Sequence, residues 1–412
     1  MKLQLTAPQR ASATIELPTS KSISNRAMLI AALCGGEPQV LHPALCDDTA
    51  VMIEALSRHE GGLINVGAAG TAMRFLTAYF ATREGVTATL DGVERMRQRP
   101  IGVLVDALRS LGADIDYLGE EGYPPLCIHG TAMRGGDVEM DGSMSSQFIS
   151  AVMMILPAIG GGTVRLTGDI VSAPYLHMTA AVMREMGADV DITGNVITVG
   201  DSYTGNDYMV EGDWSAAAPW YALAALLPES SLRLNGLSAD SIQGDARLVE
   251  LGGRLGIASR FDAQGVTLDT SGFIGCCCSN YADMTATPDL VLSWAVLMCL
   301  LERSFRMTGV RTLRLKESDR IEALREELLK LGYVLKIEGD DAISWYGERV
   351  AIEHEPPVID THGDHRLAMA FAPAAVRFPG LTIQDAEVVS KSYPAYWRHL
   401  ELAGVNIVRS EK

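Results

Sequence analysis

The sequence predicts an α/β protein of two domains, each assembled from three similar units of helices and strands. Its 412 residues exceed what one compact core usually holds, so two or three domains are expected. Amphipathic helical segments alternate with strand-like runs along the chain. A junction from helix through glycine to strand also returns about every seventy residues, which indicates an internal repeat.

The repeat is marked by amphipathic helices that end in a glycine just before a strand. These glycines lie 69 to 76 residues apart and are Gly112, Gly187, Gly256, Gly332 and Gly404. Each fits the position after a helix where the chain turns through positive φ. A weaker copy ends at Gly61-Gly62. Six such units account for nearly the whole chain and divide naturally into two domains of three.

Each unit also contains strands and a second helix. Alternating apolar and polar residues predict strands at 163–166 and 196–199. Apolar faces predict helices at 101–111 and 148–156, and another that begins near 367.

Two segments are candidates for the chain's passage between domains. A proline closes the first strand within 17–20, and 211–214 lies about halfway along the chain. If the first strand belongs with the second half, the domains are 20–212 and a discontinuous 1–19 with 213–412. The residues alone leave a single crossing open.

Composition limits the classes of partner. The net charge of −17 argues against nucleic acid or an anionic membrane as the main partner, since both need a basic surface. A local cationic pocket can still bind small anions, because more distant charges are screened. No signal peptide and no transmembrane run of about 18 apolar residues is recognised, so we expect a cytoplasmic protein.

The seven cysteines are expected to be reduced. Cys276-Cys277-Cys278 could suggest a metal site, but contiguous cysteines do not easily close a tetrahedral site, and no CxxC or HxxxH partner lies nearby. We favour a structural role and expect no metal.

Basic residues recur in short polar motifs near helix starts. They are Lys21, Arg26, Arg74, Arg99, Lys316, Arg320, Arg366 and Lys391. A cation beside Gly or Ser donors at a helix N-terminus suits a small, multiply charged anion. Helix capping is the alternative for each motif alone: Ser22 or Ser24 can cap one helix, and Asp319 with Glu322 has capping-box spacing.

Nucleotide and hydrolase motifs are missing. The chain has no GxxxxGK[ST], GxGxxG, HExxH or GxSxG sequence. The pattern therefore favours an enzyme without a cofactor that acts on two polyanions.

Nine motifs in order along residues 18–397 carry a family resemblance. They read PTSKSxSNR, AGTAMR, RQRPIGxLVDAL, SSQF, VSxPY, PDL, KESDR, DHRLAMA and KSYPxYW. This set resembles the 5-enolpyruvylshikimate-3-phosphate synthase family. The resemblance implies a two-domain inside-out α/β barrel, with three βαβαββ repeats per domain, the active site in the interdomain cleft, and the first strand returned to the second-half domain.

The resemblance also implies the reaction and its residues. The enolpyruvyl group of phosphoenolpyruvate would pass to the 5-hydroxyl of shikimate 3-phosphate, with release of phosphate. The implied shikimate 3-phosphate ligands are Lys21, Ser22, Arg26, Ser145, Ser146, Gln147, Ser172, Asp289 and Lys316. The implied phosphoenolpyruvate ligands are Lys21, Gly70, Arg99, Gln147, Arg320, Arg366 and Lys391. The implied catalytic set is Asp289 as base, Glu317 and Lys21 as proton handlers, Lys391 and His365.

Three positions depart from the family pattern. Ala68 stands where the family usually has asparagine, Phe75 where many members have proline, and Thr312 where a family asparagine precedes the KE lysine. None of them removes a charged catalytic group.

Two other functions would fit parts of this pattern. A sister enolpyruvyl transferase that acts on a UDP-sugar usually carries a cysteine before its RPI-like helix, and 91–100 contains none. A non-catalytic anion-binding module would have lost an acid or base, yet Asp289, Glu317 and Lys391 are present. We therefore expect a monomeric enzyme whose partners are its two small substrates.

Overall fold

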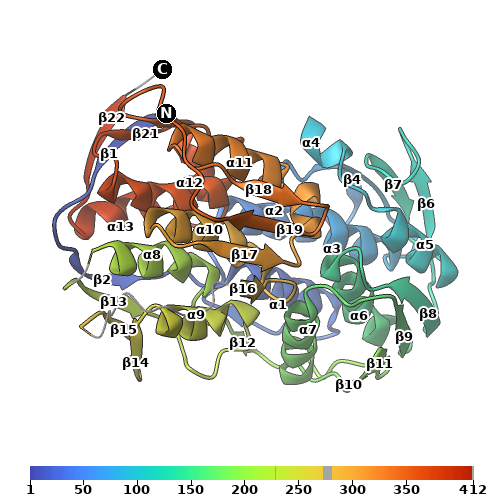
Figure 1. The fold of residues 1–412 in the computed structure, drawn as a ribbon. Helices are drawn as coiled ribbons and strands as arrows, with labels where there is room; N and C mark the ends of the chain where they lie inside the picture. The colour runs from blue at the N-terminus through green and yellow to red at the C-terminus, as the bar shows by residue number, and fades with distance from the viewer. Residues whose placement is uncertain (228, 272–280, 411–412) are drawn as a thin grey trace. The chain divides into compact units, whose positions relative to one another are not determined.

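The computed structural model describes residues 1–227, 229–271 and 281–410. The chain forms two compact units: unit 1 comprises Met1–Pro18 with Glu211–Lys412, and unit 2 comprises Thr19–Val210. Both units mix helices with small sheets (Figure 1). The Cys276-Cys277-Cys278 run lies outside the described residues.

Unit 2 begins with helix α1, ends with the short strand β12 and contains two complete repeats between them. Its helices are α1 (Lys21–Leu33), α2 (Asp47–Ser57), α3 (Gly70–Ala81), α4 (Glu94–Arg97), α5 (Gly102–Ser110), α6 (Ser146–Ile159) and α7 (Ala173–Glu185). Its strands are β3 (Val40–Leu41), β4 (Gly61–Asn65), β5 (Thr87–Asp91), β6 (Asp114–Tyr117), β7 (Leu126–His129), β8 (Gly136–Asp141), β9 (Gly162–Thr167), β10 (Val190–Thr193), β11 (Val196–Val199) and β12 (Tyr208–Met209).

Unit 1 holds the first two strands and the second half of the chain. Its α-helices are α8 (Ala218–Leu226), α9 (Leu248–Arg254), α10 (Val291–Leu300), α11 (Arg320–Lys330), α12 (His365–Phe371) and α13 (Tyr396–Leu402). Its 3-10 turns are η1 (Ser215–Ala217), η2 (Gly244–Arg247), η3 (Pro288–Leu290), η4 (Arg311–Leu315), η5 (Ala372–Val376) and η6 (Ala386–Lys391). Its strands are β1 (Lys2–Thr6), β2 (Ser12–Glu16), β13 (Ser231–Asn235), β14 (Ala258–Asp262), β15 (Gly265–Asp269), β16 (Tyr281–Asp283), β17 (Phe305–Thr308), β18 (Lys336–Glu338), β19 (Ala342–Trp345), β20 (Val358–Ile359), β21 (Leu381–Ile383) and β22 (Asn406–Ser410).

In the part of the chain that the structure describes, five four-stranded sheets share one strand pattern. The sheets are β4-β5-β7-β6, β8-β9-β11-β10, β2-β13-β15-β14, β16-β17-β19-β18 and β20-β21-β1-β22. In each, the first two strands are parallel and the remaining neighbours are antiparallel. This is the βαβαββ repeat, and the predicted fold class is confirmed.

The first repeat of unit 2 is smaller than predicted. It has α1, β3 and α2, and β3 pairs in parallel with β12 alone. Among the described residues, this repeat lacks the two antiparallel strands that end the other repeats, because only a short loop separates α2 from β4 of the next repeat. Within unit 2, therefore, two of the three expected repeats are complete.

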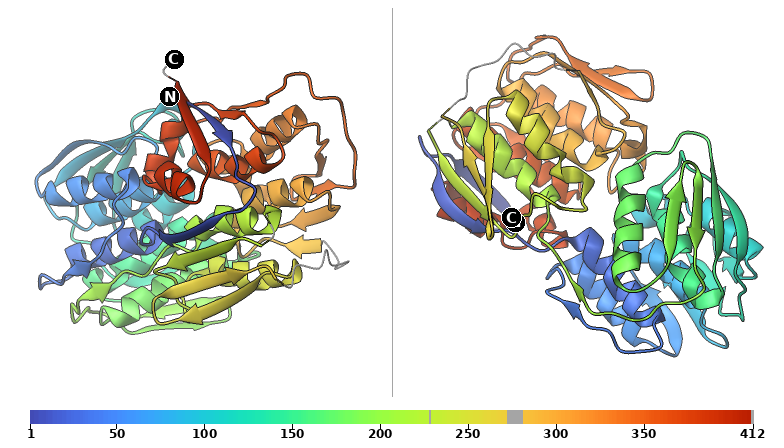
Figure 2. Two further views of the ribbon diagram at one scale, coloured as in Figure 1. Left: turned by 90° about the vertical axis from the view of Figure 1, so that its left-hand side faces the viewer. Right: turned by 90° about the horizontal axis from the view of Figure 1, so that it is seen from below.

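Strand β1 completes the last sheet of unit 1. It lies between β21 and β22, antiparallel to both, with Leu3 opposite Ile383 and Leu5 opposite Leu381 and Ile407. Leu3 and Leu5 are fully buried, which explains the alternating pattern of this strand. Figure 2 shows the blue N-terminal strand beside the red C-terminal ones.

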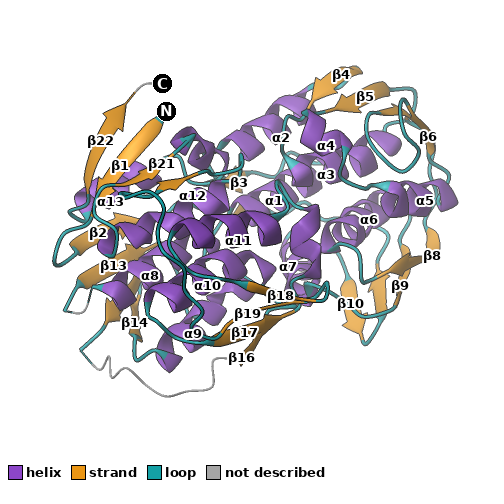
Figure 3. Cartoon of the chain, turned by 45° about the horizontal axis from the view of Figure 1, so that its top comes forward, coloured by secondary structure: helices purple, strands orange, loops and turns teal. Residues whose placement is uncertain are grey.

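Within each unit the helices gather in the interior and the sheets lie outside them (Figure 3). Helix α10 is apolar around its whole circumference and almost every residue is buried, as expected of a helix packed on all sides. The strands instead alternate buried and exposed residues, as in β1 and β8, because one sheet face meets the helices and the other meets water. None of the helices in the described chain has the length and hydropathy to cross a membrane.

The glycines that marked the repeat have the predicted conformation. Gly112, Gly187, Gly256, Gly332 and Gly404 follow their helices with φ of +97°, +93°, +87°, +83° and +96°. A side chain at these positions would strain the turn from helix into strand. Helices at 102–110 and 146–159 and strands at 162–167 and 196–199 match their predictions within a few residues.

Candidate active site

Most of the predicted site residues of unit 2 lie at the first turns of four helices, while Arg26 lies in the second turn of α1 and Arg99 lies between α4 and α5. Helices α1, α3, α6 and α7 pack on one another. Gln147, on the first turn of α6, donates from Nε2 to Thr71 Oγ1 on the first turn of α3 at 3.2 Å. Helix N-termini carry partial positive charge and unsatisfied N–H groups, so they favour an anion.

Arg26 and Arg74 are the two most buried predicted cations of unit 2. Only 2% of Arg26 is exposed. It donates to Thr179 Oγ1 at 2.7 Å, to Ser150 Oγ at 3.2 Å and to the Ser22 carbonyl at 2.9 Å. These acceptors join α1, α6 and α7, and all of them are neutral.

The guanidinium of Arg26 lies against aromatic faces, and among the described residues no carboxylate forms an ion pair with it. Its guanidinium carbon lies 5.4 Å from the centre of the Phe75 ring and 5.8 Å from that of Tyr175. Burial lowers the pKa of Arg26 to about 10, with Tyr175 opposing the shift. An anion that binds here would therefore meet a cation whose positive charge is not neutralised by a carboxylate. Phe75, one of the departures from the family pattern, thus supports this cation.

Lys21 starts α1 and pairs with an acid that the sequence did not single out. Its Nζ lies 2.9 Å from Asp48 Oδ2, and both side chains are largely buried. The cap of α1 also differs from the prediction. Ser20 is the N-cap and accepts from Ile23 N at 3.4 Å. Because the helix begins at Lys21, Ser22 and Ser24 lie inside its first turn.

Gly70 and Arg99 are in direct contact. A Cβ placed on Gly70 would lie 2.5 Å from Nη1 and 2.6 Å from Nη2 of Arg99, so only glycine leaves room for this guanidinium. Arg99 is buried. Arg74 donates to the carbonyls of Gly70 at 3.3 Å and Pro100 at 2.9 Å. It thereby joins the two segments that carry Gly70 and Arg99.

The serines of unit 2 stand at two further helix starts. Ser145 caps α6 and accepts from Gln147 N at 3.3 Å, and Ser146 begins the helix and is buried. Ser172 occupies the N-cap position of α7 without a side-chain capping hydrogen bond, and its φ of +57° and ψ of +36° are unusual for a residue other than glycine. Strained backbone of this kind clusters at ligand sites.

Arg320 is the centre of the predicted residues of unit 1. Its side chain is 2% exposed and contacts three carboxylates: Asp364 at 2.7 Å, Glu317 at 2.8 Å and Asp289 at 3.0 Å. Burial alone would lower the pKa of Arg320, but the three carboxylates outweigh it and hold that pKa above its ordinary value. Arg320 thus stays charged and orients two predicted catalytic acids.

Asp289 bridges two arginines. Its Oδ1 accepts from Arg320, and its Oδ2 accepts from Arg366 Nη2 at 2.8 Å. Asp364 also contacts both arginines. Its side chain accepts a hydrogen bond from Arg320 Nε and, as the N-cap of α12, one from the backbone N–H of Arg366 at 2.9 Å. The bridge brings residues from η3, α11 and α12 together.

Lys391 joins the same cluster through Glu317. Its Nζ lies 3.3 Å from Glu317 Oε1, and both side chains are largely buried. Lys316 is half-buried beside Glu317 in the chain. His365 is buried on α12, with Nδ1 3.6 Å from Asp364 Oδ1.

The capping box predicted for α11 is half present. Asp319 accepts from Ile321 N at 3.1 Å and Glu322 N at 3.2 Å. Glu322, however, accepts from Arg325 Nε at 2.7 Å, because this exposed cation lies one turn away. Capping thus explains Asp319, and Arg320 beside it points into the carboxylate cluster.

Several partners were missed by the sequence reasoning. Ser150, Thr179 and Tyr175 surround Arg26, and Asp48 pairs with Lys21. Each lies 27 to 153 residues from its partner or one turn inside a helix, where no local motif marks it. Tyr175 is the exception: it belongs to the VSxPY motif and could have been included.

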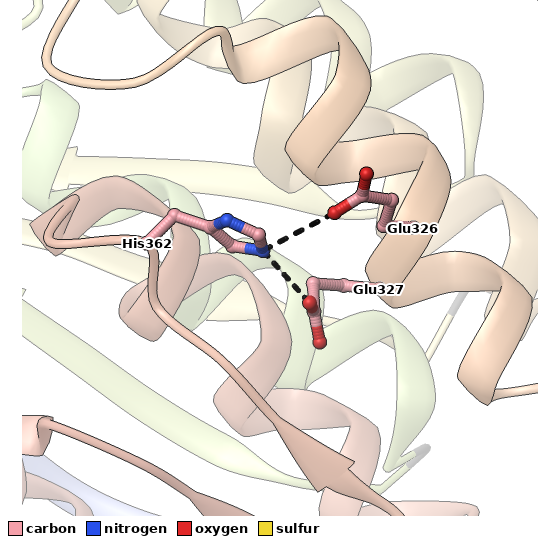
Figure 4. Close-up of side chains that lie close together, drawn as sticks. All are labelled: Glu326, Glu327 and His362. Atoms are coloured by element: carbon pink, nitrogen blue, oxygen red, sulfur yellow. Dashed lines mark hydrogen bonds and ion pairs between the residues drawn. The ribbon is translucent and has the colours of Figure 1, made fainter.

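Apart from the candidate active site, one group of side chains in the described residues has the composition of a metal site. Glu326, Glu327 and His362 lie close together (Figure 4). Buried Glu327 already accepts from Lys330 Nζ at 2.7 Å, from His362 Nε2 at 2.8 Å and from Asp360 N at 3.0 Å. An ammonium on the central carboxylate competes with a cation, so these contacts fit an ion-pair network better than a metal site.

The fold and these residues define an α/β enzyme class that handles small anions with buried arginines, lysines and helix N-termini. A family model described as EPSP synthase (3-phosphoshikimate 1-carboxyvinyltransferase) matches residues 5–61 and 57–400. The chain belongs to this family.

Curated relatives agree along the whole chain. A 3-phosphoshikimate 1-carboxyvinyltransferase of Bacteroides fragilis strain YCH46 is 46% identical over 100% of both chains. One of Syntrophobacter fumaroxidans is 37% identical over 94% of this chain and 96% of its own. The fold is also that of EPSP synthase from Acinetobacter baumannii, with a TM-score of 0.77, 22% identity, and coverage of 99% of this chain and 100% of that one.

Proposed function

We propose that this protein carries out the reaction of its family, enolpyruvyl transfer from phosphoenolpyruvate to shikimate 3-phosphate in aromatic amino acid biosynthesis. The 5-hydroxyl oxygen adds to C2 of phosphoenolpyruvate while a proton adds to C3. Phosphate then leaves C2, a proton leaves C3, and an enol ether remains. The observation that carries this proposal is the cluster in which Arg320 and Arg366 flank Asp289 while Glu317 contacts Arg320 and Lys391.

This cluster supplies the two kinds of group that the reaction needs. Carboxylates can exchange protons with the hydroxyl and the methylene, and cations stabilise the phosphate and carboxylate of phosphoenolpyruvate. Asp289 would take the hydroxyl proton, and Glu317 with Lys21 would handle the proton at C3. Lys391 would act beside Glu317. His365 would act through Asp364, which it approaches at 3.6 Å.

The two substrates would use overlapping residues. Shikimate 3-phosphate would contact Lys21, Ser22, Arg26, Ser145, Ser146, Gln147, Ser172, Asp289 and Lys316. Phosphoenolpyruvate would contact Lys21, Gly70, Arg99, Gln147, Arg320, Arg366 and Lys391. Buried Arg26 with its neutral acceptors supports the first assignment, and the packing of Arg99 on Gly70 supports the second.

Phosphate release tests the reaction. We expect release only when both substrates are present, and unchanged turnover after metal chelation, since the proposal needs no metal or organic cofactor. Release without shikimate 3-phosphate, or a requirement for a divalent metal, would contradict it. Arg99→Ala tests the assignment of ligands: it should weaken phosphoenolpyruvate binding far more than shikimate 3-phosphate binding, and equal losses would show the assignment to be wrong.

We further propose that the enzyme acts in the cytoplasm as a monomer, with its two substrates as its partners and without nucleic acid or membrane. Sedimentation of the active protein at assay concentration tests the monomer.

A further inference from the structure

Asp245 is a buried acid beside the proposed site that no motif of the sequence singled out. It lies in η2 and is 3% exposed. Ser215 Oγ donates a hydrogen bond to its Oδ2. Its Oδ1 is buried without a hydrogen-bond partner among the described residues. Burying a carboxyl oxygen without a hydrogen bond costs free energy of folding, so the presence of an aspartate at this position needs an explanation.

A short hydrogen-bonded route connects Asp245 to the site. Ser215 N donates to Asp213 Oδ1 at 2.9 Å, which fixes the serine. Ser215 Oγ in turn accepts from Arg366 Nη2 at 3.4 Å, and the same nitrogen donates to Asp289 Oδ2 at 2.8 Å. The two hydrogens of Nη2 are therefore directed at Ser215 and Asp289. Because the guanidinium is planar, these two contacts help to set its orientation, together with the bond from Nη1 to the Asp289 carbonyl at 3.4 Å.

We propose that Asp245 is a positioning residue for phosphoenolpyruvate, which acts by holding Ser215 in place to orient the guanidinium of Arg366. The inference rests on the proposed function, in which Arg366 binds this substrate. Asp245 itself is not expected to touch substrate.

The surroundings of Asp245 keep its carboxyl mostly protonated at pH values below about 7. Burial raises its pKa to about 7, the nearby charges of Asp289 and Asp213 raise it as well, and Arg366 and the Ser215 hydrogen bond oppose them. On its own element, Arg247 is directed away, toward the Asp283 carbonyl and Glu250. A protonated Asp245 leaves Arg366 with Asp289 as its ionised neighbour. Ionisation of Asp245 at higher pH would put a second negative charge near the site and weaken binding of an anionic substrate.

The test compares Asp245→Ala, Asp245→Asn and Ser215→Ala in the full-length enzyme. We expect Asp245→Ala to raise KM for phosphoenolpyruvate about tenfold or more, while the Kd for shikimate 3-phosphate changes less than about twofold. Asp245→Asn keeps an acceptor for Ser215 and should stay within about threefold of the parent at pH 7. It should also lose the part of the parent's rise in KM that occurs above pH 7.

A double variant separates positioning from general damage to the fold. Because Asp245 acts through Ser215, the Ser215→Ala/Asp245→Ala enzyme should be no worse than Asp245→Ala, whereas independent effects would multiply. Thr270→Val is the matched control, because Thr270 is another buried side chain whose hydroxyl has no hydrogen-bond partner among the described residues, and it should leave both constants unchanged.

Three outcomes would overturn the proposal: equal weakening of both substrates, multiplicative effects in the double variant, or Asp245→Asn as impaired as Asp245→Ala. If Asp245→Ala fails to fold, Ser215→Ala and Asp245→Asn still decide the question. Failure of the proposed function would look different, because the unaltered enzyme would then release no phosphate from the two substrates.

Discussion

Arg26 in unit 2 and Arg320 in unit 1 are equally buried, but their surroundings are opposite. Each is 2% exposed. Arg320 contacts the carboxylates of Asp364, Glu317 and Asp289, whereas Arg26 donates only to hydroxyls and a carbonyl and lies against two rings. The shifts in pKa follow: the pKa of Arg320 is raised and that of Arg26 is lowered.

This difference separates two uses of a buried cation. The positive charge of Arg320 is neutralised by the three carboxylates that it contacts, so its main effect is to fix the positions of those carboxylates. Arg26 keeps most of its charge available for a ligand, since neutral acceptors orient a guanidinium without cancelling its charge. We therefore expect loss of Arg320 to affect folding and catalysis together, and loss of Arg26 to affect binding.

The largest effect is expected from Arg320→Met. Removing this guanidinium leaves three largely buried carboxylates without their shared cation, which should lower the free energy of unfolding by about 3–5 kcal/mol. Urea unfolding followed by circular dichroism measures the change. Arg325→Met on the same helix is the control, because its exposed pair with Glu322 should contribute less than about 1 kcal/mol. Equal losses for the two variants would contradict the role of Arg320.

Asp245 extends the comparison to a buried acid, and it predicts a pH dependence. Its pKa is about 7 in the folded protein against an ordinary value of 3.8, so the folded state binds more protons between these values. The contribution of Asp245 to the free energy of unfolding should therefore fall as pH rises from about 4 to 7. In Asp245→Asn this fall is absent, and the variant should gain about 3–4 kcal/mol relative to the parent between pH 4 and pH 8.

Urea midpoints of the two proteins across this pH range test the prediction. Parallel curves would show that Asp245 does not titrate in this window.

Arg26→Met should act mainly on a ligand. Methionine fills similar volume without leaving a carboxylate unpaired, so the free energy of unfolding should change by less than about 1 kcal/mol. Affinity for shikimate 3-phosphate should fall by about 2–3 kcal/mol, or about 30- to 150-fold. Calorimetric titration measures this affinity, with exposed Arg165→Met as a control of the same unit. A large loss of stability with little change in affinity would show that Arg26 acts in folding and not in binding of the ligand.

The smallest effect is expected from Gly70→Ala. The added methyl must displace the guanidinium of Arg99, so phosphoenolpyruvate should bind about tenfold more weakly, with little change for shikimate 3-phosphate. Gly253→Ala is the control, since a Cβ there meets no atom within 4 Å. Unchanged phosphoenolpyruvate affinity would show that Arg99 can move without cost.

The fold could be predicted from the sequence wherever a local rule applied. Gly112 and its four counterparts mark the repeat because a helix that turns directly into a strand needs positive φ. The reduced first repeat of unit 2 was not visible, since β3 and β12 have two residues each and pair across the length of the unit.

The sequence predicted the motifs that carry the site residues, but it did not predict which side chains pair with one another. Lys21, Arg320 and Arg366 stand at helix starts that the sequence marks. Asp364 begins the DHRLAMA motif, but the motif did not show that it pairs with Arg320. Asp48, the partner of Lys21, was missed because an aspartate outside any motif gains its role only when distant segments pack. Asp245 was missed for the same reason: its effect reaches Arg366 through Ser215, which no local pattern links to either residue.

Strand β1 has a consequence for the order in which the protein can fold during synthesis. It is among the first segments to leave the ribosome, yet its two neighbours, β21 and β22, are made last. The final sheet of unit 1 must therefore wait for the end of translation, and Leu3 and Leu5 stay without their packing partners until then. Unit 2 is contiguous and is finished about halfway through, so it can fold first. An early-made hydrophobic strand that waits for its partners is a natural target for a chaperone.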